Sequence, residues 1–124
     1  MATILIADDH PDLRKLLEIQ FTQKGFTCQL ATNGLEAIQL LETQSVDLMI
    51  MDLNMPELDG WQAAAAIRAQ APTRAIPIIA LTAYSLEGDR ARALNAGCNA
   101  FFTKPVVFEE LLAEVHRLLS EIAA

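Results

Sequence analysis

Short continuous runs of apolar residues alternate along this chain with longer segments in which apolar residues recur every three or four positions. The short runs are typical of buried β-strands, and the longer segments are typical of amphipathic helices. The pattern predicts strands over residues 3–7, 26–31, 46–51, 76–81 and 100–103. Pro77 has no backbone donor for a strand ladder, so we expect it at the entrance of the fourth strand.

Three helices are predicted between the first four strands. The first begins at Pro11, the second near Asn33, and the third after Gly60, where an alanine-rich segment follows. In the first two helices, the side chains expected to face the core are Leu13, Leu16, Leu17, Phe21, Leu35, Ile38 and Leu41.

The last two helices differ in the strength of their apolar pattern. The fourth, over residues 86–96, offers only Ala91, Leu94 and their neighbours to the core, so we expect it to be loosely held. The fifth repeats apolar residues at spacings of three and four and should be well anchored, through Phe108, Leu111, Leu112, Val115, Leu118, Leu119 and Ile122.

Five strand–helix units in succession predict an α/β fold, with one parallel sheet covered by helices on both faces. The 124 residues are the length of a single domain, which we assign to residues 1–124. All strands of such a sheet end at the same edge, and ligands bind at that edge. Residues that follow the strands are therefore the first candidates for a functional site.

Composition narrows the range of functions. The formal net charge is -7 and the nine basic residues are scattered, which disfavours direct nucleic-acid binding. No stretch reaches the roughly 18 uninterrupted apolar residues of a membrane-spanning helix, and the first residues do not resemble a secretory signal. We expect a cytoplasmic domain without membrane insertion, in which Cys28 and Cys98 are buried free thiols.

Ionisable and hydroxyl side chains follow four of the five predicted strands. Asp8 and Asp9 follow the first, Asp52 the third, Thr82 the fourth and Lys104 the fifth. Any one of them is explained by a helix cap, a turn or simple solvation. Their convergence at one sheet edge is better explained by a functional site.

The chemistry of this set points to phosphoryl transfer. Clustered carboxylates stay ionised together only when a cation compensates them, and an all-oxygen ligand set suits Mg²⁺. Asp52 can then attack a phosphoryl group to form an aspartyl phosphate. The metal ion, the Thr82 hydroxyl and the Lys104 ammonium can share the charge on its oxygens.

Over essentially its whole length, the chain resembles the receiver domains of two-component response regulators. The resemblance lies in four stretches of sequence, which are Ile6-Ala7-Asp8-Asp9, Asp52-Leu53-Asn54-Met55-Pro56-Glu57-Leu58-Asp59-Gly60, Ala80-Leu81-Thr82-Ala83 and Gly97-Cys98-Asn99-Ala100-Phe101-Phe102-Thr103-Lys104-Pro105. It implies a flavodoxin-like (βα)5 domain with strand order 2-1-3-4-5. It also implies a histidine kinase or histidine phosphotransfer protein as phosphodonor and a downstream protein as target.

The resemblance also assigns roles to individual residues. Asp52 would be the phosphoacceptor, with Asp9, Asp52 and the backbone carbonyl of Asn54 binding Mg²⁺ directly and Asp8 through water. Thr82 and Lys104 would contact the phosphoryl group. The remaining assignments are a cis Lys104–Pro105 peptide bond, a switch formed by Thr82 and Phe101, and tuning of dephosphorylation by Asn54 and Tyr84. Phe101 departs from the tyrosine often found at its position and lacks that hydroxyl.

The switch would change a surface formed by the fourth helix, the fifth strand and the last helix. We therefore interpret the chain as a signalling domain that acts only on its own phosphorylation and dephosphorylation. Three alternatives remain. A haloacid-dehalogenase-like phosphatase needs an aspartate where Asn54 stands, a flavodoxin-like cofactor binder needs a phosphate-cradling loop after the first strand, and a phosphorylation-independent docking module does not need the acid set.

Two histidines invite a stronger interpretation than the sequence supports. His10 follows the two aspartates, but a histidine at a helix start is more often partly exposed, and Mg²⁺ prefers oxygen ligands. His116 lies on the predicted last helix, whereas the phosphorylated histidine of a phosphotransfer protein belongs to a helical bundle.

Overall fold

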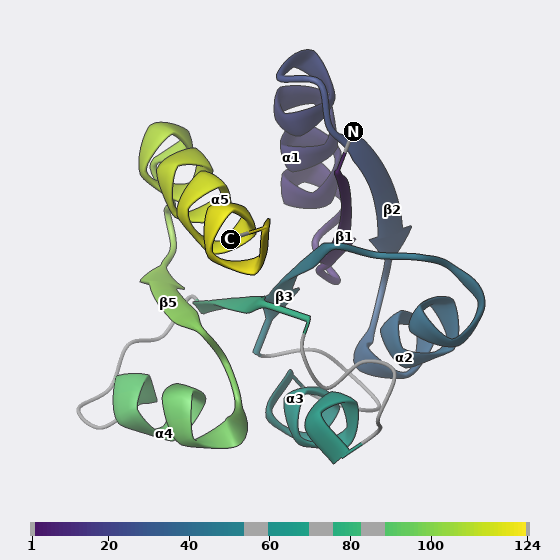
Figure 1. The fold of residues 1–124 in the computed structure, drawn as a ribbon, viewed down its shortest axis with the longest axis vertical. Helices are drawn as coiled ribbons and strands as arrows, with labels where there is room; N and C mark the ends of the chain where they lie inside the picture. Colours follow the sequence, from purple (N-terminus) through teal and green to yellow (C-terminus); the bar gives the residue numbers. More distant parts are fainter. Residues whose placement is uncertain (1, 54–59, 70–75, 83–88, 124) are drawn as a thin grey trace.

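The computed structural model describes residues 2–53, 60–69, 76–82 and 89–123, and Figure 1 shows their arrangement. Within these ranges five strands alternate with five helices. They are β1 (Thr3–Ala7), α1 (Pro11–Gln23), β2 (Thr27–Ala31), α2 (Gly34–Thr43), β3 (Leu48–Asp52), α3 (Gly60–Ala69), β4 (Ile78–Thr82), α4 (Asp89–Ala96), β5 (Ala100–Thr103) and α5 (Phe108–Ala123). None of the described helices is both long enough and apolar enough to cross a bilayer.

The strands form one parallel sheet in the order β2-β1-β3-β4-β5. The strand order and the α/β class expected from the sequence are thereby confirmed. β1 and β3 pair directly, with Ala7 opposite Met51, so the residues that end these two strands lie side by side. Their position near the middle of the sheet places those residues between neighbouring strands on both sides.

Two apolar layers hold the helices against the sheet. One cluster joins β1, β3 and β4 to α1 and α5 through residues such as Leu17, Phe21 and Val115. The other joins the opposite face of the sheet to α2, α3 and α4 through residues such as Ala37 and Ile67. Figure 1 shows α1 and α5 on one side of the sheet and α2, α3 and α4 on the other. Burial on both faces explains why the strands read as continuous apolar runs.

The boundaries of the strands differ slightly from the prediction. β1 and β5 match it, whereas β2, β3 and β4 begin one or two residues later than predicted. β3 and β4 each extend by one residue, so that Asp52 and Thr82 are the last residues of their strands and do not follow them. Pro77 lies directly before β4, where its carbonyl accepts a hydrogen bond from Met49 N at 2.9 Å.

Leu16, Leu35 and Leu94 are exposed, and the prediction that they face the core is wrong. Each lies one or two positions from the buried stripe of its helix, and every position turns the side chain by about 100° around the axis. In α2 the buried small residues are Gly34 and Ala37, and among the side chains described in α4 the buried one is Ala93.

Ala91, also predicted to face the core, is exposed, and Ala96 is partly buried. The side chains at positions 121–123, among them the predicted core residue Ile122, are not among those that the structure describes. Residues 86–88, the predicted start of the fourth helix, also lie outside the described residues. Both cysteines are free, as expected. Cys98 is buried, but Cys28 is only partly buried.

The amino ends of the strands are connected by side-chain hydrogen bonds. Thr3 N donates to Asp47 Oδ2 at 2.7 Å, directly before β3. At the entrances of β4 and β5, the guanidinium of Arg68 donates to the carbonyls of Ile76 and Gly97 and to Asn99 Oδ1. The three acceptors of Arg68 lie just before β4 and β5, so this one residue of α3 joins both strand entrances.

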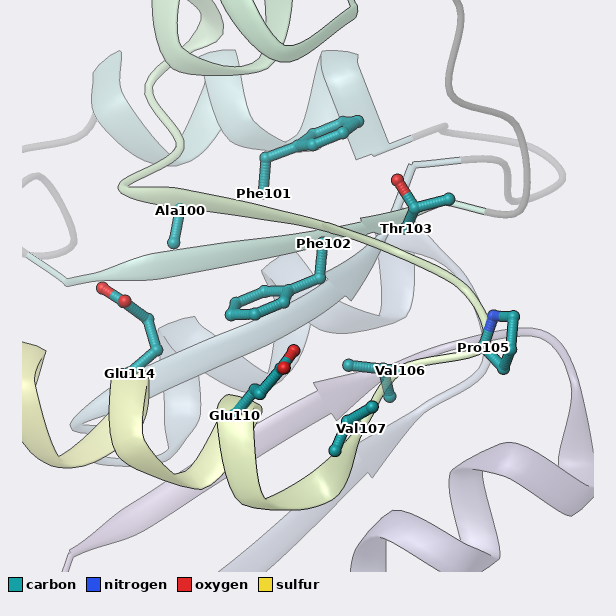
Figure 2. Close-up of a pocket in the computed structure, with 9 residues that line it drawn as sticks. All are labelled: Ala100, Phe101, Phe102, Thr103, Pro105, Val106, Val107, Glu110 and Glu114. Carbon is teal, nitrogen blue, oxygen red and sulfur yellow. The ribbon is translucent and has the colours of Figure 1, made fainter.

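β5 is an edge strand of the sheet. A groove lies between it and the first turns of α5, with Phe102 and Val107 among the residues that line it. Figure 2 shows the side chain of Glu110 beside Phe102 and that of Glu114 pointing from α5 toward the Ala100 end of β5. The groove therefore combines an apolar wall with acidic side chains.

Candidate functional site

Sheet pairing brings the predicted site residues to one edge of the sheet. Asp8 follows β1, and its backbone N donates to Ala31 O at 3.1 Å, which extends the pairing with β2 by one residue. Asp52 ends β3 inside the β1–β3–β4 sheet. Lys104 follows β5, and its backbone N donates to Thr82 O at 2.7 Å. These backbone hydrogen bonds fix the directions from which the side chains approach one another.

Lys104 connects the two most buried carboxylates. Its Nζ lies 3.0 Å from Asp8 Oδ2 and 3.2 Å from Asp52 Oδ2. Asp8 and Asp52 each expose only 1% of their surface, and the Lys104 side chain exposes 13%. Burial by itself lowers the pKa of Lys104, but the hydrogen bonds and negative charges of Asp8 and Asp52 outweigh it, and the pKa is raised. The lysine therefore stays cationic at the site.

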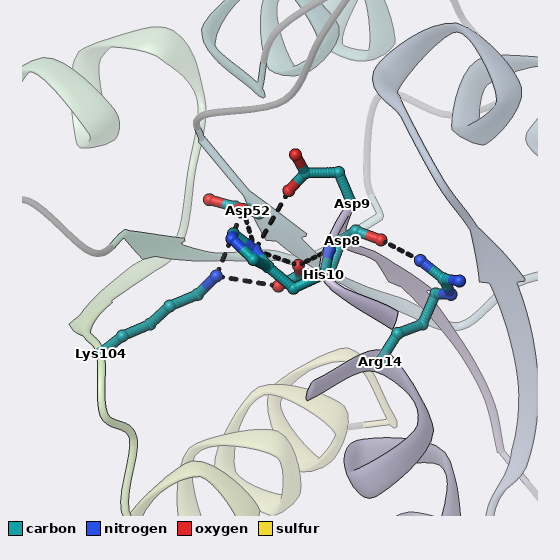
Figure 3. A network of polar contacts seen from close by, with 6 residues as sticks. All are labelled: Asp8, Asp9, His10, Arg14, Asp52 and Lys104. Carbon is teal, nitrogen blue, oxygen red and sulfur yellow. Dashed lines mark hydrogen bonds and ion pairs between the residues drawn. The ribbon is translucent and has the colours of Figure 1, made fainter. Parts of the chain in front are cut away.

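His10 lies among the same carboxylates, although its side chain is 62% exposed. Its Nδ1 is 3.1 Å from Asp8 Oδ1, 3.2 Å from Asp9 Oδ1 and 3.7 Å from Asp52 Oδ2 (Figure 3). The partial exposure expected from the sequence is confirmed. Its closeness to three carboxylates was not expected, and the only signal for it in the sequence is its position directly after Asp8 and Asp9.

The turn that carries Asp8, Asp9 and His10, between β1 and α1, is held by hydrogen bonds between side chains and the backbone. His10 N donates to Asp8 Oδ1 at 2.8 Å, and Arg14 Nη1 donates to the backbone carbonyl of Asp8 at 2.7 Å. Figure 3 shows Arg14 approaching Asp8 from α1, on the side away from Lys104. Asp8 thus holds this turn through both its backbone carbonyl and its side-chain carboxylate.

The carboxylates fit a divalent cation. Ligand atoms of Asp8, Asp9, His10 and Asp52 all lie within 4.8 Å of one another. Asp9 Oδ1 is buried and has no hydrogen-bond partner. A buried carboxylate oxygen without a donor is costly unless a cation compensates it, and carboxylate oxygens are the ligands that Mg²⁺ prefers.

The structure also places most of the other predicted residues. Thr82 is buried at the end of β4, and Phe101 is buried on β5, where it pairs with Ala80 two positions before Thr82. The peptide bond between Lys104 and Pro105 is cis. Asn54 and Tyr84 lie outside the described residues.

The parallel sheet and its strand order define a flavodoxin-like α/β domain, with an acidic cluster that could hold a cation at the carboxyl ends of its strands. A family model described as the response regulator receiver domain matches residues 4–116. The chain belongs to this family, whose members are phosphoacceptor signalling domains of two-component systems.

Similar proteins occur both as short chains and as parts of larger sensors. The chain is 40% identical over 114 residues to the 14.6 kDa protein in the sodA1 3′ region of Leptolyngbya boryana, an alignment of 92% of this chain with 87% of that protein. It is 34% identical over 108 residues to the sensor histidine kinase RcsC of Salmonella typhi, covering 87% of this chain but 11% of the kinase. The chain thus spans about a tenth of that sensor.

A solved structure with similar geometry is the receiver domain of a sensor histidine kinase from Pseudomonas aeruginosa. It superimposes with a TM-score of 0.88 at 37% identity, over 96% of this chain and 98% of that domain. That structure has a magnesium ion coordinated in its active-site cleft.

Proposed function

We propose that Asp52 accepts a phosphoryl group from a phosphorylated histidine of a donor protein and that the modified domain then controls a protein partner. The observation that carries this proposal is the buried Asp52 carboxylate at the end of β3, paired with Lys104 at 3.2 Å beside Asp8 and Asp9. A buried carboxylate held next to a fixed ammonium is suited to nucleophilic attack on an anionic phosphoryl group.

In the transfer, an oxygen of Asp52 forms a bond to phosphorus while the phosphorus–nitrogen bond of the donor histidine breaks. The electron pair of the broken bond stays on the imidazole nitrogen. The Lys104 ammonium lies where it can balance charge on the transferred phosphoryl oxygens, and the Thr82 hydroxyl can donate to one of them. The domain modifies its own carboxylate and turns over no external substrate.

A divalent cation would assist the transfer by neutralising negative charge at the site. Asp8, Asp9 and Asp52 are the described residues that would hold Mg²⁺. When bound, Mg²⁺ would neutralise part of the negative charge that gathers between the carboxylates and the incoming phosphoryl group.

The proposal is tested by intact-mass measurement after incubation with acetyl phosphate and Mg²⁺. The wild type should gain the mass of one phosphoryl group, whereas Asp52→Asn should gain none. A chelator should prevent the gain in the wild type. Asp12→Asn, which removes an exposed carboxylate from the first turn of α1, serves as the matched control and should be modified like the wild type.

Two results would count against Asp52 as the acceptor. One is a mass gain in Asp52→Asn equal to that of the wild type. The other is no mass gain in the wild type with acetyl phosphate and Mg²⁺, together with no binding of the beryllofluoride phosphoryl mimic, although Mg²⁺ binds. The second result would favour a phosphorylation-independent docking module.

We further propose that Thr82 and Phe101 transmit the modification. Phe101 packs in the same apolar cluster as Ala93 of α4 and Cys98, on the face of the sheet covered by α4. If Thr82 turned toward a phosphoryl oxygen, it would vacate space into which the Phe101 ring can fold, and the packing between Phe101 and α4 would change. Backbone amide signals of α4 and β5 should therefore shift when beryllofluoride is added in NMR. Unchanged signals there would contradict the switch.

A second surface suits the phosphodonor. A groove that includes Lys104 runs between α1 and the segment after β5, and the exposed side chains of Leu16 and Val107 line it. An apolar surface that adjoins the site lets a donor helix dock while its histidine reaches Asp52. Leu16→Ala should slow phosphorylation by a donor protein more than phosphorylation by acetyl phosphate, which needs no docking. An equal effect on both reactions would argue against this surface.

The groove between β5 and α5 suits the downstream partner. Its acidic side chain Glu110 favours a protein segment that presents a basic residue beside an apolar one, whereas Glu114 is already paired with Arg117 on α5. Replacing Glu110 with lysine should weaken such a partner without altering acetyl-phosphate labelling of Asp52. Unchanged partner affinity in the variant would exclude the groove as the output contact.

A further inference from the structure

Among the described residues of the acidic cluster, His10 is the one that offers a nitrogen atom as a metal ligand. It is the residue before the first turn of α1, and its side chain makes no capping hydrogen bond to that helix. The imidazole instead extends over the carboxylates, with Nδ1 at 3.1, 3.2 and 3.7 Å from oxygens of Asp8, Asp9 and Asp52 (Figure 3). The ring therefore faces the location that suits a cation.

These separations match those between neighbouring ligands of one metal ion. With metal–ligand bonds of about 2.0–2.2 Å, adjacent ligand atoms lie roughly 3.0 Å apart in an octahedron and roughly 3.4 Å apart in a tetrahedron. The distances from His10 Nδ1 to Asp8 Oδ1 and Asp9 Oδ1 fall in that interval, and the distance to Asp52 Oδ2 lies slightly above it. One ion can contact the imidazole and the carboxylates with small movements of the side chains.

A second observation points to a ligand at the same place. The Nδ1 atom carries at most one hydrogen, and its hydrogen-bond geometry is satisfied by Asp8 Oδ1. Asp9 Oδ1, 3.2 Å from the same nitrogen, stays buried without a hydrogen-bond partner. Lys104 compensates Asp8 and Asp52 but does not reach Asp9, so Asp9 Oδ1 is the oxygen that a divalent cation would satisfy together with the other carboxylates.

We propose that this cluster takes a second class of cation besides Mg²⁺, the borderline transition-metal ions such as Ni²⁺, Co²⁺ or Zn²⁺, with His10 Nδ1 as an additional ligand. The inference rests on the proposed function in so far as the carboxylates form a divalent-cation site. Imidazole suits these ions, whereas Mg²⁺ takes oxygen ligands and gains little from nitrogen. His10 therefore determines which cation the site prefers.

The proposal has a consequence for signalling. An ion held by His10, Asp8, Asp9 and Asp52 occupies the place of Mg²⁺ and engages the carboxylate that accepts the phosphoryl group. The two classes of cation therefore exclude each other, and His10 sets which of them occupies the site when both are present.

The experiment compares the tag-free wild type with His10→Phe and His116→Ala by calorimetric titration with Ni²⁺ and with Mg²⁺. Phenylalanine keeps a ring at position 10 but removes its nitrogen, and the side chain there is exposed enough to tolerate the change. His116 is an exposed histidine on α5 and so controls for unspecific binding to imidazole. Cu²⁺ electron paramagnetic resonance reports directly whether a nitrogen ligates the bound ion.

We expect His10→Phe to weaken Ni²⁺ binding by at least about tenfold, since losing even a supporting partner of a metal ligand costs that much. Mg²⁺ affinity should change by less than about threefold, because its ligands are oxygens. The nitrogen splitting of bound Cu²⁺ should disappear in His10→Phe and persist in His116→Ala. Equal Ni²⁺ affinities in wild type and His10→Phe, or tighter binding by the variant, would overturn the proposal. Tighter binding would mean that the imidazole competes with the ion.

The outcome is separable from that of the receiver chemistry. If Asp52 is labelled in Mg²⁺ but Ni²⁺ binding does not depend on His10, the second cation class is excluded while the phosphoacceptor proposal stands. If Ni²⁺ binding depends on His10 but no phosphoryl adduct forms in Mg²⁺, the metal site stands and the phosphoacceptor proposal fails.

Discussion

The central residues of this domain are carboxylates whose mutual repulsion is offset by one lysine. Asp8 and Asp52 are almost fully buried, and both contact Lys104 Nζ through a carboxylate oxygen. Carboxylates placed this closely raise the free energy of the folded state unless cations compensate them. The site is therefore where the fold depends most strongly on charge.

Replacing Lys104 with glutamine should lower the free energy of unfolding by about 2–3 kcal/mol in the presence of a chelator, because two buried carboxylates lose their counter-ion. Saturating Mg²⁺ should recover much of this loss. Urea unfolding with and without Mg²⁺ measures both effects. Lys15→Gln, which breaks a surface pair with Glu18, is the control and should change stability by less than about 0.5 kcal/mol. If Lys104→Gln were as stable as the wild type in chelator, the compensating role would be wrong.

Substitution of two glycines distinguishes the cost of backbone strain from the cost of a steric clash. Both adopt a positive φ, +94° at Gly25 and +113° at Gly97. A Cβ at Gly25 would meet nothing within 4 Å, whereas one at Gly97 would lie 2.5 Å from Arg68 Cγ. Gly25→Ala should cost about 1 kcal/mol from strain alone. Gly97→Ala should cost about 2–3 kcal/mol, because Arg68 must move as well.

Chemical denaturation of the two alanine variants tests this difference. In an Arg68→Ala background the clash is removed, so Gly97→Ala should then cost about 1 kcal/mol, like Gly25→Ala. Equal costs of Gly97→Ala with and without the Arg68 side chain would show that this side chain does not confine the turn.

At the scale of elements, the sequence predicted the fold well because burial on both sides of the sheet leaves an unambiguous apolar run for each strand. Two helices were harder, because in α2 and α4 a predicted leucine is exposed while an alanine one or two positions away is buried. In α4, Leu94 and Ala91 are exposed and Ala93 is buried. A short helix with few apolar residues does not define its buried face by periodicity alone.

The candidate site was predictable where it follows from sheet topology. Residues at the ends of parallel strands must meet, so Asp8, Asp52 and Lys104 could be assigned to one location before their distances were known. The position of Arg68 could not be predicted, because it depends on the path of a long side chain to residues 8 to 31 positions away. The contacts of His10 with Asp8 and Asp9 are local in sequence, but its approach to Asp52 depends on the pairing of β1 with β3 and on the orientation of the imidazole ring.

The contrast between α4 and α5 predicts unequal local stability. Of the side chains described in α4, Ala93 alone is buried, whereas α5 buries Leu111, Val115 and Leu118. Little buried apolar surface means a small free energy of local opening. Backbone amides of α4 should exchange with deuterium markedly faster than those in the middle of α5, as measured by NMR under native conditions. Equal protection of the two helices would contradict a loosely held α4.

At the scale of the whole molecule, stability should fall in alkaline solution because of Cys98. Burial raises the pKa of this thiol from 9.0 to about 11. Between these pH values the folded chain keeps a proton that the unfolded chain has lost, so the free energy of unfolding decreases as the pH rises. The loss attributable to Cys98 is about 2 kcal/mol between pH 9 and pH 11.

The measurement is the free energy of unfolding of wild type and Cys98→Ala at several pH values from 8 to about 11, the range set by the two thiol pKa values. Alanine removes the ionisable group, so the variant should lose less stability than the wild type over this range. Other groups, including Lys104 with its raised pKa, contribute equally to both proteins. Parallel curves would show that the thiol does not cause the alkaline loss.

The two edges of the sheet carry different tasks. The carboxyl edge gathers Asp8, Asp52 and Lys104, whereas the amino edge is fastened by Asp47, Arg68 and Asn99. Substitutions at the amino edge can alter robustness and leave the reacting groups in place, and substitutions at the carboxyl edge can alter chemistry without loosening the strand entrances. A change among the strand entrances is therefore felt as stability alone, whereas a change at Lys104 is felt as chemistry and stability together, which makes the amino edge the freer of the two to vary.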